Sequence, residues 1–363
     1  MSEHIQLSVK NRVGLLLLDR PKALNSLSLE MARTLTQTLL AWRNDANVRA
    51  VVIHSSSERA FCAGGDIRFF YNVGRKTPQS GSALLEDFFS EEYALNHLIH
   101  HYPKPYIALM DGIVMGGGMG VAQGGPGNRM RIVTDRTRMA MPEVNIGLFP
   151  DVGGSHFLSR TPGHTGTYLG VTGEIIGAAD ALYAGLADTY VPAERLPDLL
   201  ELITSVDDTD IRSMIRDFAA PHQSQAAPSS SMLAAQRPLI DRHFGHDSVR
   251  AIAASLAQDA NPFAQKTLTA MNKRSPLMMC VTLSQLRRGA HMAMADCLRM
   301  ERTIVRRCFE HGEVLEGVRA VVIDKDNAPK WNPATLEEVT PEMIAPFFAT
   351  AWPPHAHPLR DLD

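Results

Sequence analysis

Two glycine clusters are the first residues whose type and spacing could support chemistry. They read "FCAGGDI" at residues 61–67 and "GIVMGGGMG" at residues 112–120. Gly65 precedes a plausible helix start at "DIRFFYN", and Gly117 precedes another at "MGVAQ". A glycine lets a ligand approach the backbone closely, and N–H groups at helix starts point outward with a favourable dipole. Together the clusters favour an anion or oxyanion site, although either alone is equally typical of a tight turn without a ligand.

A pair of carboxylates supplies the second chemical signal. Glu143 follows Pro142, and Asp151 follows Pro150, on either side of the apolar loop "VNIGLF". Apolar surroundings raise the pKa of a carboxyl group and a neighbouring carboxylate raises it further, which suits a general acid or base near neutrality. The alternative is that Asp151 caps a helix near Ser155 and that Glu143 is a solvated strand end.

Several other mechanisms lack their sequence signatures. The chain has no GxxxxGK[ST], no complete GxGxxG, no GxSxG and no HExxH. Its four cysteines show no CxxC spacing, so neither a disulfide framework nor a metal site is expected. We also expect no cofactor.

Composition excludes further classes of protein. A formal charge of −3 and a pI near 6.5 give no basic footprint, so nucleic acid is not expected as a partner. The sequence shows no leader pattern and no run of about 18 apolar residues, so no membrane partner is expected. These features predict a soluble, cytoplasmic protein.

The elements that must position these residues follow from hydrophobic patterning. "HIQLSVK" and "VGLLLLD" flank Asn11-Arg12 and predict a hairpin, and Ser28 can cap a helix. Buried strands are expected at "RAVVIHS", "PYIALM" and "MRIVT". This order predicts an α/β fold with loops gathered at strand ends.

Composition along the chain predicts three consecutive regions. They are a catalytic core at 1–204, a linker or mobile loop at 205–232, and a mainly helical region with a tail at 233–363. The linker prediction rests on the Pro, Ser, Gln and Ala content of residues 218–232. Within the last range, the apolar run "GVRAVVID" at 317–324 resembles a strand.

Four motifs in this order resemble the crotonase, or enoyl-CoA hydratase/isomerase, superfamily. They are "RPKALNSLS" at 20–28, "RAFCAGGDI" at 59–67, "GIVMGGGMG" at 112–120 and "MPEVNIGLFPDVGG" at 141–154. "FFSEEYALNHLI" and the C-terminal "GVRAVVIDKDNAPKWNPATLEEVT" narrow the resemblance to its 3-hydroxyisobutyryl-CoA hydrolase branch, over nearly the whole chain. The resemblance implies a spiral of ββα units with a mainly helical C-terminal region.

The family resemblance also assigns partners and substrate-binding positions. It implies an acyl-CoA substrate, with coenzyme A entering as part of that substrate, and a possible homo-oligomer. The oxyanion hole of the family corresponds to the N–H groups of Gly65 and Gly117. Glu92 matches a position near the substrate, where it could contact a hydroxyl group. The positions that match the coenzyme A loop and its opposite wall are Lys22, Ala23, Leu24, Ala63, Asp66 and Ile67.

One departure from the family pattern bears on the reaction. Hydratases of this family carry a catalytic glutamate at the position of Gly120, which we count here among the substrate-binding positions. Their second glutamate corresponds to Glu143. Hydration needs two carboxylates to hold and split one water. The absence of the glutamate at position 120 therefore disfavours hydration and favours hydrolysis of the thioester.

The predicted hydrolysis leaves alternatives open. Glu143 would attack the thioester to form an anhydride or would activate water, and Asp151 would position water or protonate the departing thiolate. A hydratase or isomerase whose second carboxylate has moved to Asp151 or Glu92 remains a rival. A non-catalytic protein that binds acyl-CoA is the other.

Overall fold

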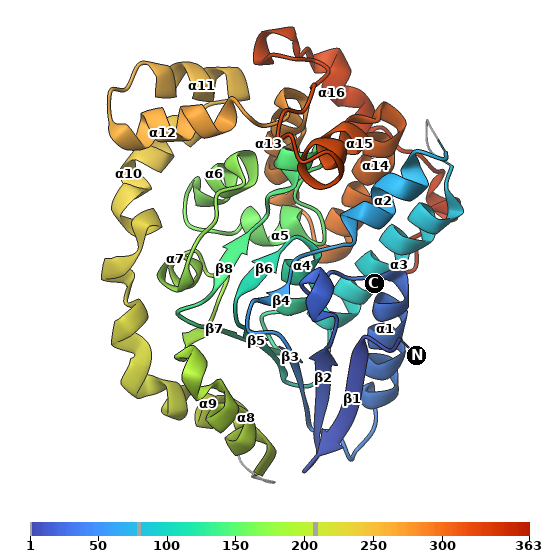
Figure 1. The fold of residues 1–363 in the computed structure, drawn as a ribbon, viewed down its shortest axis with the longest axis vertical. Coiled ribbons are helices and arrows are strands. Elements are labelled where there is room, and N and C mark those ends of the chain that lie inside the picture. Colours follow the sequence, from blue (N-terminus) through green and yellow to red (C-terminus); the bar gives the residue numbers. More distant parts are fainter. Residues whose placement is uncertain (1, 78–80, 206–209) are drawn as a thin grey trace. The chain divides into compact units, whose positions relative to one another are not determined.

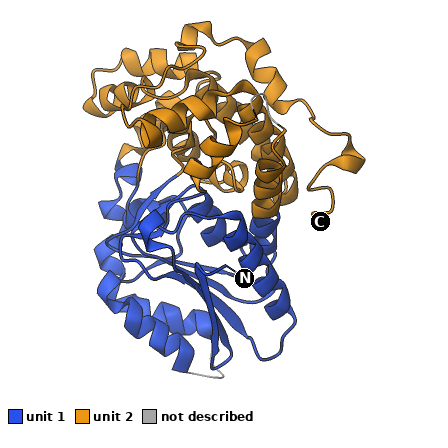
Figure 2. Cartoon of the chain, turned by 45° about the vertical axis from the view of Figure 1, so that its right-hand side comes forward, with its two compact units in different colours: residues 1–65, 94–140, 176–235 blue, residues 66–93, 141–175, 236–363 orange. Residues whose placement is uncertain are grey.

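The computed structural model describes residues 2–77, 81–205 and 210–363, which form two compact units. Unit 1 contains residues 1–65, 94–140 and 176–235, and unit 2 contains residues 66–93, 141–175 and 236–363 (Figure 2). Each unit is assembled from three separate stretches of chain. The units therefore do not follow the three consecutive ranges expected from composition.

Unit 1 is built on a six-stranded sheet with the order β1-β2-β3-β5-β7-β9 (Figure 1). β1 and β2 are antiparallel, and every later neighbour pairs in parallel. The strands are β1 (Ile5–Lys10), β2 (Val13–Leu18), β3 (Ala50–Ser55), β5 (Tyr106–Met110), β7 (Arg129–Val133) and β9 (Thr189–Tyr190). The strands predicted from the apolar runs are confirmed, as is the α/β fold class.

The N-terminal hairpin and its following helix form where local signals place them. Asn11 and Arg12 both have positive φ, as a two-residue turn between antiparallel strands requires. Ser28 caps α1 (Leu29–Arg43), because its side chain accepts a hydrogen bond from the Met31 N–H. Both predictions are confirmed.

A second, three-stranded sheet in unit 1 carries the glycine turns. β4 (Ala60–Cys62), β6 (Ile113–Met115) and β8 (Arg138–Ala140) are parallel, in that order. The turn after β4 contains Gly64 and Gly65, and the turn after β6 leads into α4 (Gly117–Gln123). Because parallel neighbours end at the same edge of a sheet, these two turns lie side by side.

Helices of unit 1 cover part of the range predicted as a linker. Residues 206–209 lie outside the described residues, but α9 (Ile211–Ala219) follows directly and packs into the core. Ile211, Met214, Ile215 and Ala219 join a buried cluster with residues of β3, β5, β7 and α8 (Leu196–Ser205). The periodic apolar residues of α9 precede the Pro- and Ser-rich stretch, so the composition of that stretch does not describe them. The other helices of this unit include η1 (Pro21–Ala23) and α7 (Ala178–Tyr183).

Unit 2 is helical in its described residues. Its main elements are α2 (Ile67–Gly74), η2 (Glu143–Ile146), α5 (Gly154–Leu158), α6 (Thr165–Thr172), α11 (Val249–Ala257), α12 (Pro262–Met271), α13 (Pro276–Gly289), α14 (Met294–His311), α15 (Glu313–Val318), η6 (Arg319–Ile323) and α16 (Pro341–Phe348). Two further helices, α3 (Ala83–His100) and α10 (Met232–Phe244), contribute residues to both units. The Phe70, Phe88, Phe89 and Phe309 rings pack together, with centroids 4.8 to 6.4 Å apart. These rings form an aromatic core within unit 2.

The strand expected at residues 317–324 is wrong. This run forms the end of α15 and the π-helical turn η6. Arg319 pairs there with Glu316 at 2.8 Å and with Asp324 at 2.7 Å. Ion pairs between residues this close in the chain fit a helical backbone. The β-branched residues of this run therefore do not form a strand. No helix among the described residues is long and apolar enough to cross a membrane.

Candidate active site

The two glycine clusters of unit 1 pack against each other. A Cβ on Gly118 would lie 2.2 Å from the Cys62 carbonyl oxygen, so only glycine fits there. Gly64 has a φ of +101°, and a Cβ on it would lie 3.4 Å from the Gly117 nitrogen. The neighbours Gly65 and Gly117 therefore come together at the ends of β4 and β6. Gly117 begins α4, where the first N–H groups have no acceptor within the helix.

The loop predicted to lie along coenzyme A contacts this site within unit 1. Lys22 is exposed and Ala23 ends η1, while the Leu24 carbonyl accepts a hydrogen bond of 3.0 Å from the Ala63 N–H. Asn25, which sequence reasoning missed, is fully buried and its amide donates to Ser55, Ala60 and Phe61. Asn25 has a positive φ, which asparagine adopts more readily than most residues, so its residue type in "ALNSL" was the available signal.

Three other predicted positions have mainly structural roles in this structure. Asp66 is the N-cap of α2, and its side chain accepts from the Phe69 N–H at 3.1 Å. Ile67 begins the same helix in unit 2. Gly120 is buried within α4 of unit 1, where it brings no carboxylate.

Two of the predicted carboxylates are buried in unit 2 without a partner for one oxygen. Glu92 on α3 is 2% exposed and Glu143, the first residue of η2, is 7% exposed. Glu92 Oε1 and Glu143 Oε2 accept no hydrogen bond from the described residues. Burial, and next the charge of Asp151, hold the pKa of each carboxyl well above its usual range. Glu143 is therefore not the solvated strand end considered as an alternative.

Asp151 is the third carboxylate, and Tyr93 fixes its direction. The Tyr93 hydroxyl donates to Asp151 Oδ2 at 2.7 Å. Burial raises the pKa of Asp151 to about 6, against the opposing effect of this hydrogen bond. The N-cap of α5 is Gly153, which makes no side-chain capping bond, so Asp151 is not the helix cap considered as an alternative. Tyr93 adjoins Glu92 in "SEEY", which was the available signal for it.

Two further side chains, missed from the sequence, hold the loop after Asp151. The fully buried Glu301 of α14 accepts the N–H groups of Gly153 at 2.8 Å and Ser155 at 2.9 Å. The Gln285 amide of α13 donates to the Pro150 carbonyl and to the Ser155 hydroxyl. Both lie more than a hundred residues from the loop in sequence, and no local pattern marks them.

Each unit offers its own kind of chemical group. Unit 1 presents backbone N–H groups at glycine turns, which can stabilise negative charge on a carbonyl oxygen. Unit 2 presents carboxyl groups whose raised pKa values suit proton transfer near neutral pH or nucleophilic attack. Both kinds of group occur in enzymes that break or hydrate acyl derivatives.

The amino-acid sequence of this chain is similar to those of known proteins. The family model described as "Enoyl-CoA hydratase/isomerase" matches residues 13–348. A protein named "3-hydroxyisobutyryl-CoA hydrolase, mitochondrial" from Gallus gallus is 38% identical over 343 residues, covering 94% of this chain and 87% of the relative. The protein of the same name from Homo sapiens is 38% identical over 351 residues, covering 96% and 89%.

Solved structures with the same fold carry different names. The "Carnitinyl-CoA dehydratase from Mycobacterium thermoresistibile" is 39% identical with a TM-score of 0.88, covering 97% of this chain and 98% of its own. The "enoyl-CoA hydratase from Rhodobacter sphaeroides 2.4.1" is 36% identical with a TM-score of 0.85, covering 96% and 98%. The similar proteins therefore agree on the family and differ on the reaction.

Proposed function

The chain belongs to the enoyl-CoA hydratase/isomerase family, and we propose that it hydrolyses the thioester of a short β-hydroxyacyl-CoA, with 3-hydroxyisobutyryl-CoA of valine degradation as the substrate. The observation that carries this proposal is the set of carboxyl groups. Gly120 stands where hydratases have one glutamate, while Asp151 joins Glu143 in unit 2 and raises its pKa. The missing glutamate disfavours addition of water to a double bond, and the remaining acids support the proposal of attack on an acyl group.

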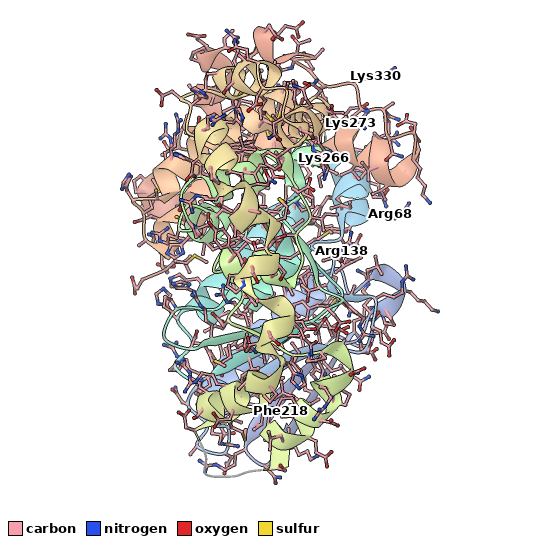
Figure 3. The ribbon with its side chains drawn as sticks, turned by 90° about the vertical axis from the view of Figure 1, so that its left-hand side faces the viewer. Arg68, Arg138, Phe218, Lys266, Lys273 and Lys330 are labelled. Atoms are coloured by element: carbon pink, nitrogen blue, oxygen red, sulfur yellow. The ribbon has the colours of Figure 1, made fainter. Side chains whose placement is uncertain are left out.

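Uncompensated positive charge on unit 2 supports a substrate that carries phosphates. Arg68, Lys266, Lys273 and Lys330 are labelled in Figure 3. Lys266 pairs with Glu174 at 3.4 Å, and the other three make no ion pair within 4.0 Å among the described residues. Arg68 follows directly after Asp66 and Ile67, the positions proposed to line the coenzyme A site. The positive side chains of this group fit the anionic end of coenzyme A.

The proposed reaction begins at the thioester carbonyl. The N–H groups of Gly65 and Gly117 receive its oxygen, and each such donor contributes about 3 kcal/mol to lowering the barrier. Glu143 attacks the carbonyl carbon or removes a proton from the attacking water. Asp151, held by Tyr93, positions that water or protonates the departing thiolate.

Glu92 is proposed to select the β-hydroxyl group of the substrate. Burial raises the pKa of Glu92, which favours the protonated carboxyl, a group that can donate as well as accept. Its unpartnered Oε1 is buried and costly to leave unsatisfied, and a substrate hydroxyl would satisfy it. A substrate without that hydroxyl should therefore bind less well.

The experiment that tests the proposed function compares two reactions of the wild-type protein. Release of free thiol from (S)-3-hydroxyisobutyryl-CoA is measured beside hydration of crotonyl-CoA. The proposal predicts rapid thiol release, slower release from isobutyryl-CoA, and little hydration. Hydration of crotonyl-CoA without thiol release would instead establish the second candidate, a hydratase, which the names of the two solved structures favour. Binding without either reaction would leave only an acyl-CoA-binding role.

An isotope experiment examines the two possible routes, which are an anhydride with Glu143 and direct attack by water. A single turnover in ¹⁸O-labelled water, followed by mass analysis of peptides containing Glu143, reports whether this side chain bonds to the acyl group. Label in Glu143 supports the anhydride, because water opens it at the glutamyl carbon. Label in the acid product alone is expected from direct attack by water, and also from an anhydride that water opens at the acyl carbon.

A further inference from the structure

The backbone directly after Asp151 adopts a conformation that its residues disfavour. Val152 has a φ of +52° and Gly153 a φ of +90°. Glycine tolerates positive φ, but a β-branched residue there is a steric outlier. Such strained residues persist only where the surrounding structure over-determines them. Something other than local preference must therefore hold Val152.

Contacts from α13 and α14 hold this turn on both sides of Val152. Glu301 uses both carboxylate oxygens, Oε2 for the Gly153 N–H and Oε1 for the Ser155 N–H. Gln285 bonds Pro150 before the turn and Ser155 after it. Glu301 and Gln285 are both 0% exposed, so water does not compete for these bonds.

We propose that Glu301 is a positioning residue that holds the strained turn at Val152 and thereby aims Asp151 at the substrate. This inference rests on the proposed function, in which Asp151 handles the water or the leaving thiolate. Glu301 does not touch the reacting atoms and acts through the Gly153 and Ser155 amides. A buried carboxylate is costly, and its two acceptor oxygens match two amides that point into the core.

A single substitution tests whether Glu301 positions the turn at Val152. Glu301→Gln keeps the size of the side chain but turns an amide NH₂ toward a backbone N–H, so one of the two bonds is lost. We expect kcat to fall about 100-fold with KM within about threefold, because a displacement of about 1 Å at a reacting group has that effect. The matched control is Asp180→Asn, since Asp180 accepts the Leu233 N–H and the Ser231 hydroxyl within unit 1. Both of these bonds go to Asp180 Oδ1, and an asparagine oxygen can still accept them, so the control removes a carboxylate charge and should keep its kcat.

A second substitution separates positioning from general stability. Val152→Gly removes the steric penalty of positive φ, so the turn needs less holding. In the Glu301→Gln background it should restore kcat about 5- to 30-fold, whereas alone it should change kcat by less than about threefold. An unchanged kcat in Glu301→Gln, or no recovery in the double variant, would overturn the proposal.

Crystal structures of both single variants give a result that does not depend on any substrate. The proposal predicts that Glu301→Gln moves Val152 to negative φ and breaks the bond between Tyr93 and Asp151, while Asp180→Asn leaves both in place. An unmoved turn in Glu301→Gln contradicts the inference even if the wild type proves inactive on thioesters. Conversely, a moved turn in an inactive protein keeps the positioning role of Glu301 and rejects only the proposed function.

Discussion

Unit 1 and unit 2 make their chemical groups in opposite ways. In unit 1 the groups are backbone amides, placed by two parallel strands that end together and by glycines that permit close approach. In unit 2 they are buried side-chain carboxyls from separate helices and loops. Tyr93 holds Asp151, while Gln285 and Glu301 hold the loop that follows it. A backbone site is therefore encoded locally, whereas an acid site depends on contacts across the unit. Added side-chain volume should therefore disrupt the backbone site, whereas loss of a carboxyl group should disrupt the acid site.

The largest effect is expected from the closest glycine contact in unit 1. Gly118→Ala would place a Cβ 2.2 Å from the Cys62 carbonyl oxygen, a backbone atom that can move only with its strand. We expect activity to fall at least 100-fold and stability to fall by about 1 to 3 kcal/mol. Gly127→Ala is the control, because no atom lies within 4 Å of its added methyl group. Wild-type activity in Gly118→Ala would show that the glycine turns do not form the proposed site.

In unit 2, loss of a charge should matter without loss of fold. Asp151→Asn keeps the shape of the side chain but removes its ability to transfer a proton, so kcat should fall about 100- to 10,000-fold. The thermal midpoint should stay the same or rise, because a buried charge is removed. Steady-state kinetics and thermal unfolding check this. A large fall in stability would mean that Asp151 is mainly structural.

A smaller and more specific effect is expected at Tyr93. Its hydrogen bond lowers the pKa of Asp151, so Tyr93→Phe should shift the corresponding limb of the pH–rate profile upward from about 6. Tyr106→Phe is the matched control, since it removes a buried hydroxyl that donates to the Val121 carbonyl in unit 1. If both variants keep the wild-type profile, Tyr93 does not tune Asp151.

The smallest effect is expected in stability as a function of pH. The folded pKa of Glu143 is raised, so the folded protein binds the proton more tightly than the unfolded chain does. Stability is then lost as pH rises from about 4.5 through the folded pKa. Glu143→Gln should reduce this loss and stabilise the protein at pH 8 by about 1 kcal/mol or more. Denaturant unfolding at pH 5 and pH 8 checks it, and an unchanged difference would contradict the raised pKa.

This comparison also explains what could be predicted from the sequence. Gly65 and Gly117, the Ser28 cap and the hairpin at Asn11 are set by neighbours in the chain, and each was predictable. Glu143 and Asp151 were recognisable as acids, but their surroundings were not. Glu301 contacts the Asp151 loop across about 150 residues, and Gln285 across about 130. The run at 317–324 shows the converse, because ion pairs of Arg319 outweigh its strand-like composition.

The central claim is that Glu143 breaks the thioester of a short β-hydroxyacyl-CoA. It is tested most directly by measuring thiol release from (S)-3-hydroxyisobutyryl-CoA by the wild type and by Glu143→Gln at the same enzyme concentration. The account predicts rapid release by the wild type and at least a 1,000-fold slower rate in the variant, with a near-native thermal midpoint. Release at comparable rates by both proteins would contradict it.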